Sequence, residues 1–502
     1  MNLENYFNTF KKQVIGDGEF FNTPDGKKPL LYADWTASGR LYNPIESVLI
    51  HKLGPYVANT HTETNISGSS MTMAYAQAKQ LIKKHVNASP SDIIITSNSG
   101  MTGVVNKFQR ILGLKIHEKF RPLIDSQIEK PVVFVSHMEH HSNQTSWLET
   151  IAEVVVIPPN TEGLVSLDAL KNLLKKYGDR KVKIAAITSC SNVTGIFTPY
   201  HEIAETMHLN GGWCFVDFAC SAPYIPIDMH PENDLQYLDA IYFSPHKFLG
   251  GPGSSGVLIF NQSLYQNKIP DHPGGGTVDW TNPWGEHKYL EKIELREDGG
   301  TPGFLQTIKA ALAIKLKEEM GVENIATREH QMVAKIMPAL KAIPKLHLLA
   351  EQHSNRLGIF SFYIEGLHFN LGVKLLNDKF GIQVRGGCSC AGTYGHYLLE
   401  VSRKKSNEIT HKIDVGDLSE KPGWIRCSVH PIMSDEEIDY IIDSIKSLAL
   451  HFEDWKKAYQ YDSHTNEFVH NTFDDQLENE VVSWFDEPNK LKERNEFEGI
   501  FG

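Results

Sequence analysis

The residues around Lys247 form a sequence context in which its side-chain amine could react covalently. It follows the apolar run Ala240-Ile-Tyr-Phe243, lies beside His246, and precedes a glycine-rich loop that ends at Gly256. An amine at the end of an apolar run, followed by a flexible loop, suits a lysine held for Schiff-base chemistry with a carbonyl group. The stretch therefore predicts a covalent lysine site.

The same loop also admits a second interpretation. Gly251, Gly253 and Gly256 have the GxGxxG spacing of a dinucleotide-binding loop, which needs a helix directly after the glycines. Here the glycines run into Val257-Leu-Ile-Phe260, which is typical of a strand. We therefore expect no dinucleotide site at this loop.

Three further groups of polar residues follow other predicted strands. Asp217 could keep a pyridine nitrogen protonated, His140 offers a flat ring for stacking, and Ser97-Asn-Ser-Gly-Met-Thr-Gly103 could hold a phosphate before a helix. Each feature alone also fits a cap or a turn, and His137-Met-Glu-His-His141 could be a metal site. Together with Lys247, the groups match what pyridoxal 5'-phosphate requires. We expect that cofactor and no bound metal.

These residues need a sheet to position them. Six short apolar runs alternate with helical patterns between about residues 70 and 260: Val132–Val135, Val154–Ile157, Ile184–Ile187, Cys214–Val216, Ala240–Phe243 and Val257–Phe260. Strands that are apolar on both faces fit a mostly parallel sheet covered by helices, which is an α/β fold. Helices are expected over Leu167–Tyr177 and from near Val104.

A long helical pattern covers Ile308–Lys317, and beyond about residue 335 the arrangement of apolar runs differs from that of the first part of the chain. Strands at Ile359–Ile364 and Trp424–Ser428, with helices near Asn370–Lys379 and from about Asp435, indicate a smaller α+β domain. The expected divisions are an N-terminal segment (1–30), a large cofactor-binding domain (31–330), a small C-terminal domain (331–460) and an acidic surface appendage (461–502). Part of that appendage is expected to be disordered.

The composition argues against several classes of protein. The net charge is -12 and no basic patch is concentrated anywhere, so we expect no binding to nucleic acid or to an anionic membrane surface. No apolar run approaches the roughly 20 residues needed to span a bilayer, and the N-terminus lacks a secretory pattern. We therefore expect a soluble cytoplasmic protein.

Cysteine usage separates two groups of thiols. Six cysteines in 502 residues are too few for a disulfide scaffold. Four lie in or beside apolar runs, where burial is the expected role: Cys190, Cys214, Cys220 and Cys427. Cys388 and Cys390 instead lie in a glycine-flanked loop, where a thiol could react or a Cys-x-Cys pair could bind zinc.

Eight short motifs occur in an order that resembles a known family. They are Asn98–Thr102, Glu139–Asn143, Ser191–Gly195, Asp217–Ala219, Ser244–Lys247, Gly274–Thr277, Gly299–Pro302 and Arg426–Ser428. Over about residues 30 to 450 the chain resembles the class V aminotransferases, which have the fold type I of pyridoxal-phosphate enzymes, and within them the cysteine desulfurase and selenocysteine lyase branch. Each motif alone is weak, but eight in this order are specific.

The resemblance implies a role for each matching position. Lys247 would bond the cofactor and move the substrate α-proton, while Arg426 would bind the substrate carboxylate. The other implied contacts are Asp217 at the pyridine nitrogen, His140 stacked on the ring, Asn192 at the ring hydroxyl or the substrate, and Gly100, Met101, Thr102, Ser244 and His246 at the phosphate. Thr277 would reach the phosphate of a neighbouring subunit, which implies a homodimer.

The loop around Cys390 distinguishes members of the family. In desulfurases a cysteine a few residues after an arginine attacks the substrate sulfur and becomes a persulfide, and Cys390 lies five residues after Arg385. The resemblance implies that Cys390 is this sulfur acceptor and that Cys388 takes a position commonly held by histidine. Cys388 could resolve a persulfide on Cys390. Zinc binding and a structural role remain the alternatives for the pair.

Cys220 is a departure from the family pattern. The family usually places a glutamine three residues after the aspartate, where it assists the ring hydroxyl of the cofactor, and this chain has Cys220 there. The sequence therefore leaves open how that hydroxyl is held.

The predicted function is cleavage of the Cβ–S bond of L-cysteine, or of the close analogues selenocysteine and cysteine sulfinate. The products would be alanine and a persulfide on Cys390, which a sulfur-acceptor protein would receive. One alternative is another reaction of the same family: transamination, epimerisation or β-elimination without a persulfide. Another is a non-catalytic protein that binds a metal through the Cys-x-Cys loop.

Overall fold

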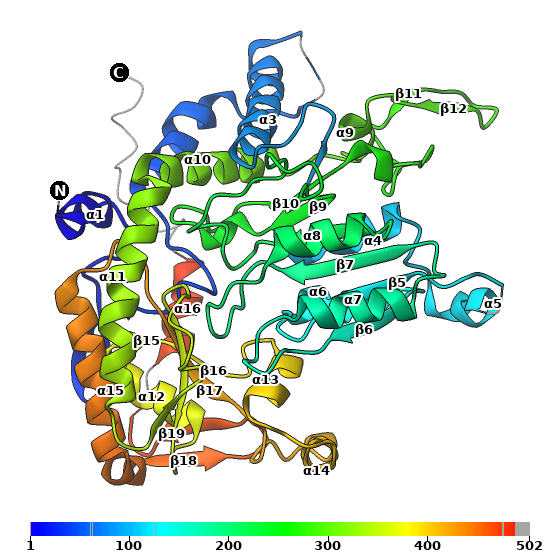
Figure 1. Ribbon diagram of the computed structural model, residues 1–502. Helices are drawn as coiled ribbons and strands as arrows, with labels where there is room; N and C mark the ends of the chain where they lie inside the picture. The colour runs from blue at the N-terminus through cyan, green and yellow to red at the C-terminus, as the bar shows by residue number, and fades with distance from the viewer. Residues whose placement is uncertain (1, 61, 63, 126, 474–475, 487–502) are drawn as a thin grey trace, which may run out of the picture.

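A seven-stranded sheet forms the centre of the larger part of the molecule (Figure 1). The computed structural model describes residues 2–60, 62, 64–125, 127–473 and 476–486. Across the sheet the strands are β4 (Ile93–Ser97), β10 (Gly256–Phe260), β9 (Ala240–Phe243), β8 (Trp213–Asp217), β7 (Lys183–Thr188), β5 (Val132–Ser136) and β6 (Glu153–Ile157). The last six coincide with the predicted apolar runs, and β4 is an edge strand that the sequence analysis missed.

The direction of the strands confirms the predicted α/β fold. From β6 through β5, β7 and β8 to β9 the strands run parallel, whereas β10 is antiparallel to both β9 and β4. Every residue of β5, β7, β9 and β10 is buried, as expected for strands covered on both faces. Because the last of the GxGxxG glycines, Gly256, begins the strand β10, the helix that a dinucleotide-binding loop requires does not follow the glycines.

Helices on both faces create two apolar cores. Phe134 belongs to one core, while its neighbours Val133 and Val135 belong to the other, because successive side chains of a strand point to opposite faces. The helices around this sheet include α3 (Ile66–His85), α4 (Gly100–Ile111), α6 (His141–Leu148), α7 (Leu167–Lys176), α8 (Tyr200–His208) and α10 (Phe304–Met320).

The helix predicted from Val104 begins one turn earlier, at Gly100. Gly100 has φ 60°, a left-handed conformation that glycine adopts without strain, and the chain turns there from β4 into α4. The glycine-containing stretch that suggested a loop is therefore the first turn of the helix.

A second, four-stranded antiparallel sheet lies in the other part of the molecule. Its strands are β13 (Leu346–Leu348), β14 (Ile359–Ile364), β17 (Trp424–Ser428) and β16 (Arg385–Gly387), and it packs with α11 (Val322–Lys341), α12 (Phe369–Phe380) and α15 (Asp435–Trp455). These elements match the predicted smaller α+β unit, while the boundaries between domains remain a prediction.

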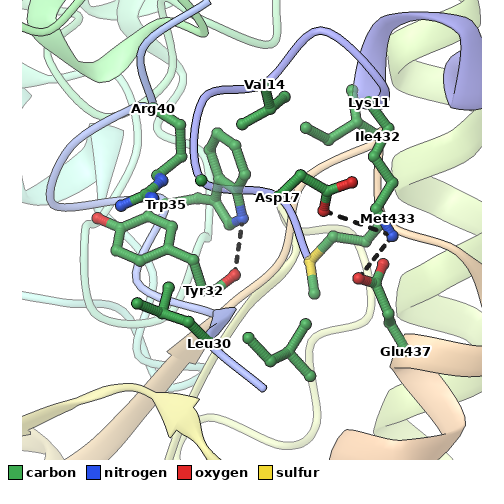
Figure 2. Close-up of a pocket in the computed structure, with 12 residues that line it drawn as sticks. Lys11, Val14, Asp17, Leu30, Tyr32, Trp35, Arg40, Ile432, Met433 and Glu437 are labelled. Carbon is green, nitrogen blue, oxygen red and sulfur yellow. Dashed lines mark hydrogen bonds and ion pairs between the residues drawn. The ribbon is translucent and has the colours of Figure 1, made fainter. Parts of the chain in front are cut away.

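The N-terminal segment packs against this smaller part. Helix α1 (Leu3–Lys11) buries Phe7 and Phe10, and the Lys11 ammonium lies 2.6 Å from a carboxylate oxygen of Glu437 on α15 (Figure 2). The cavity in Figure 2 has a volume of about 40 Å³, which is too small for an amino acid, so we interpret this region as structural.

The start of the predicted appendage is ordered. Strands β18 (Tyr459–Asp462) and β19 (Glu467–His470) form a hairpin that contacts α12, and Phe468 packs on the core. This hairpin was not predicted from the sequence. The rest of the prediction for the tail falls partly on residues 474, 475 and 487–502, which lie outside the described residues.

Further short strands and α-helices complete the described part of the chain. They are β1 (Phe20–Thr23), β2 (Gly26–Pro29), β3 (Leu31–Tyr32), α2 (Asn43–Ser47), α5 (Arg121–Asp125), β11 (Val278–Thr281), β12 (His287–Tyr289), α9 (Ile293–Arg296), β15 (Ile382–Gln383), α13 (Gly392–Leu398), α14 (Arg403–Asp414) and α16 (Leu477–Trp484). Within the described ranges, every helix is too short or too polar to span a bilayer.

Candidate functional site

A cavity of about 200 Å³ lies at the carboxyl edge of the large sheet. Residues that end or follow β5, β7, β8 and β9 line one side of it, as expected for an α/β fold, where these strand ends surround the ligand. Residues of β16, β17 and the Cys390 loop line another side. The predicted residues that meet at this cavity are Met101, Thr102, His140, Asn192, Asp217, Ser244, His246, Lys247, Cys390 and Arg426.

Lys247 and Asp217 form the floor of the cavity. Asp217 is the last residue of β8 and is buried, and its carboxylate accepts a hydrogen bond of 2.8 Å from the Ala219 amide. Burial raises the pKa of Asp217 to about 6, against the opposing effects of that amide and of the Lys247 charge. Burial also lowers the pKa of the Lys247 amine, which favours the neutral, nucleophilic form.

His140 presents a neutral ring to the cavity. It caps the N-terminus of α6, where its Nδ1 accepts a hydrogen bond of 3.1 Å from the Ser142 amide. Burial, together with the nearby Lys247 charge, lowers the pKa of His140 to about 3. A neutral ring whose Nδ1 accepts carries its proton on Nε2, so the ring remains an uncharged plane at neutral pH.

The start of α4 forms an anion cradle next to this floor. The Met101 amide donates a hydrogen bond of 2.8 Å to Ser244 Oγ, and the Thr102 and Ser142 hydroxyls lie 2.7 Å apart. Unpaired amides in the first turn of a helix and hydroxyls beside them attract a phosphate. This arrangement fits the predicted phosphate contacts.

Arg426 lines the cavity, and part of its guanidinium has no hydrogen-bond partner among the described residues. Its two terminal nitrogens donate to the Asn192 carbonyl at 3.1 Å and to Asp34 Oδ1 at 2.7 Å. Its buried Nε, like the buried Thr36 hydroxyl nearby, has no hydrogen-bond partner among the described residues. Buried polar groups are normally satisfied, so both groups point to a polar ligand in this cavity.

The Cys390 loop enters the cavity in a strained conformation. Gly387, Ser389 and Cys390 have φ values of 102°, 50° and 56°, and the latter two are in a left-handed region that side chains disfavour. Cys390 is exposed, whereas Cys388 is partly buried against the core.

Hydrogen bonds from the large domain hold this loop. The side-chain Nδ2 of Asn192 donates to the Ser389 carbonyl at 2.7 Å, and the backbone amide of His141 donates to the Cys390 carbonyl at 2.7 Å. The Gly392 amide donates to His141 Nε2 at 3.0 Å. His141 therefore binds the loop on both sides of Ala391.

Two other predicted residues behave differently. Gly100 begins α4 directly before Met101 but does not line the cavity, and its contact with a phosphate remains a prediction. Thr277 is buried outside this cavity, where its hydroxyl donates to the Gly274 carbonyl at 2.6 Å. Its contact with a partner subunit remains a prediction.

The cysteines of the apolar runs are buried, as predicted. Two of them, Cys190 and Cys220, also line the cavity, and both thiols donate to the Ser191 carbonyl at 3.7 Å. Burial raises the pKa of the Cys190 thiol well above its usual value. Cys220 thus occupies the floor where the family usually has a glutamine.

The His137 ring has contacts of its own outside the cavity. His137 Nε2 lies 3.0 Å from the Gly163 carbonyl, and its ring meets the edge of Tyr394. Among the described residues, no group of three or more histidine, cysteine or acidic side chains is arranged to hold a metal ion.

Asp34 and His141 bind residues of this site and were not predicted from the sequence. Asp34 follows the apolar run Leu30-Leu-Tyr-Ala33, which is the same pattern of a strand followed by an acid that identified Asp217. His141 lay inside a recognised motif, but nothing in the local sequence indicated that it would bind the loop around Cys390.

Comparison with known proteins places these features in a family. The aminotransferase class-V family profile matches residues 31–441. A probable cysteine desulfurase of Halalkalibacterium halodurans is 28% identical over 367 residues, which cover 72% of this chain and 84% of the relative. A cysteine desulfurase of Escherichia coli is 34% identical over 265 residues, which cover 52% of this chain and 62% of the relative.

Solved structures have the same fold. An apo cysteine desulfurase from Thermococcus onnurineus superposes with a TM-score of 0.68 at 22% identity, covering 84% of this chain and 95% of that one. A cysteine desulfurase of Escherichia coli superposes with a TM-score of 0.67 at 22% identity, covering 89% and 98% of the two chains. With the family profile spanning both the large sheet and the second sheet, this chain belongs to the aminotransferase class-V family.

Proposed function

We propose that this protein is a pyridoxal-phosphate-dependent cysteine desulfurase that passes the sulfur of L-cysteine to Cys390. The main support for the proposal is that five residues line one cavity of about 200 Å³: Lys247, Asp217, His140, Arg426 and Cys390. The names of the relatives support the choice of substrate.

The residues present fit pyridoxal 5'-phosphate. The Lys247 amine would bond its aldehyde, buried Asp217 would face its pyridine nitrogen, and the neutral ring of His140 would stack on it. The first turn of α4, with Ser244 and His246, would hold the phosphate. The unpartnered Arg426 Nε and Thr36 hydroxyl leave donors for the substrate.

Bound pyridoxal phosphate supplies an electron sink that acidifies the substrate Cα–H and weakens the bond from Cβ to sulfur. Lys247 would serve as the base and acid for the α-proton, since burial lowers the pKa of its amine and so favours the neutral form. With the cofactor bound, Asp217 would pair with the pyridine nitrogen, and Arg426 would bind the substrate carboxylate in the cavity that Lys247 also lines.

Cys390 supplies the sulfur acceptor. Its thiolate attacks the substrate sulfur, the Cβ–S bond breaks, and a proton is delivered to the β-carbon. L-cysteine and the Cys390 thiol thereby become alanine and a Cys390 persulfide, with atoms and electrons balanced and no external oxidant. Exposure of Cys390 leaves the persulfide accessible to an acceptor protein.

The assembly and location are part of the same proposal. We infer a homodimer in which Thr277 contacts the phosphate of the neighbouring site, and a cytoplasmic location. We also retain the large domain over 31–330 and the small domain over 331–460, because the cavity has walls from both sheets.

The direct test is to incubate the purified, cofactor-supplemented protein with L-cysteine and a thiol reductant. We expect alanine and sulfide in equal amounts, and borohydride reduction should fix the cofactor to Lys247 by peptide mapping. Pyruvate and ammonia in place of alanine would indicate β-elimination and contradict the proposal. Selenocysteine and cysteine sulfinate, assayed in parallel, define the preferred leaving group.

A further inference from the structure

Asp34 connects two arginines at the substrate wall. Its Oδ1 accepts a hydrogen bond of 2.7 Å from Arg426, and its Oδ2 accepts one of 3.0 Å from Nε of Arg385. Arg426 is buried and Arg385 is about half exposed, and both line the cavity. We refer to Arg385, Asp34 and Arg426 as the charge triad.

The backbone around Asp34 is fixed in place. The Ser428 amide donates to the Ala33 carbonyl at 2.8 Å, and the Thr36 amide donates to Ser428 Oγ at 3.0 Å. Trp35 stacks on His430 with ring centroids 4.3 Å apart. Asp34 is therefore held beside the end of β17, the strand that carries Arg426.

The net charge of the triad influences which anions can bind beside it. Two guanidinium groups and one carboxylate sum to one net positive charge, which is the complement of a single carboxylate. Without the Asp34 charge the same wall would carry two positive charges within reach of one ligand and would favour a dianion. At the low effective dielectric of a partly buried site, one unit charge at contact distance alters the affinity of an anion strongly.

We propose that Asp34 is a specificity-determining residue. Its charge favours the binding of amino acids with a single negative group in this cavity and disfavours the binding of dianionic ones. The inference rests on the proposed function in taking an α-amino acid as the ligand. Because Asp34 uses one oxygen for each arginine, an arriving carboxylate can take its place on Arg426 while Asp34 keeps Arg385. Specificity then follows from the unfavourable interaction of Asp34 with a second negative charge on the ligand.

The test uses ligands that lack an amine and so cannot react with the cofactor. Dissociation constants of propionate, a monoanion, and succinate, a dianion, are measured by calorimetry on the cofactor-loaded enzyme and its Asp34→Asn variant. We expect the substitution to shift the ratio of the two constants toward succinate by at least about tenfold. Asp25→Asn is the matched control, since Asp25 pairs with Lys379 outside the cavity at 2.6 Å and should leave the ratio unchanged.

Arg385→Gln gives a second and opposite test. It removes one positive charge while keeping Asp34, so both ligands should bind more weakly and succinate should lose at least about tenfold more than propionate. An unchanged ratio in Asp34→Asn, or equal weakening of both ligands, would show that Asp34 only orients Arg426 and would overturn the inference. These binding ratios need no turnover, so they are independent of whether L-cysteine yields alanine and sulfide.

Discussion

The floor of the cavity and the Cys390 loop achieve reactivity in different ways. On the floor, Asp217 ends the strand β8 and Lys247 lies in the short turn after β9, and burial shifts the pKa of each group. In the loop, Cys390 is exposed, and its placement depends on a left-handed backbone held by hydrogen bonds from the large domain. The reactivity of the floor residues therefore depends on their desolvation, whereas the reactivity of Cys390 depends on where the loop places its thiol.

Helix α6 joins these two regions. His140 faces the cavity as a neutral ring, and the next residue, His141, binds the backbone on both sides of Ala391. Adjacent histidines thus contact the floor side and the Cys390 loop from one helix terminus. If the two regions are separable, substitutions should affect proton transfer and sulfur transfer independently.

Replacing Lys247 should have the largest effect, because it removes the only residue that we assign to both cofactor attachment and proton transfer. In Lys247→Ala, we expect sulfide release from L-cysteine and exchange of the α-proton of L-alanine in D₂O to fall at least about thousandfold. Both rates are measurable, by sulfide assay and by NMR. Lys268→Ala changes an exposed lysine and serves as the control; retention of a tenth of the exchange rate by Lys247→Ala would contradict the assignment.

Cys390→Ser should separate the two regions. We expect sulfide release to fall at least about hundredfold, because a serine hydroxyl does not ionise at neutral pH, while α-proton exchange on the floor stays within about twofold. Cys388→Ser is the matched control two residues away. Full sulfide release by Cys390→Ser would favour a reaction without a persulfide, and a comparable loss in Cys388→Ser would indicate that both thiols act.

His141→Ala should weaken the loop without altering the floor. The substitution leaves the Gly392 amide without its acceptor, which costs about 1 kcal/mol and corresponds to about a fivefold fall in sulfide release. We expect α-proton exchange to be unchanged and His141→Gln, which retains an acceptor, to recover most of the rate. Equal losses of exchange and sulfide release would show that α6 supports both regions as one unit.

The last prediction concerns stability rather than catalysis, in the packing beneath the Asp34 segment. Burial lowers the pKa of His430 to about 3, so this ring stays neutral in the folded protein while the unfolded chain binds a proton below about pH 6.5. His430 therefore contributes to a loss of stability as the pH falls below 6.5. In His430→Gln, the loss of unfolding free energy between pH 7 and pH 5 should shrink by about 2 kcal/mol in urea titrations. An unchanged pH dependence would contradict a buried, neutral His430.

The floor could be predicted well from the sequence, because its signals are local. An apolar run followed by a polar residue marks the end of a buried strand, and this pattern located Asp217, Lys247 and the strand before His140. The same rule applied to Leu30–Ala33 would have identified Asp34. The start of α4 was misplaced by one turn because a glycine can begin a helix as well as form a loop.

The amino-acid sequence alone determined the α/β fold, the lysine and acid of the floor, and the thiols that stay buried, because strand periodicity and burial depend on neighbouring residues. Only the tertiary structure decided the partners of Asp34, which lie 351 and 392 residues away, the left-handed backbone at Cys390, and the contact of His141 with the loop. Hydrogen bonds between distant segments and the strain that they stabilise exist only after the two parts of the chain have packed together.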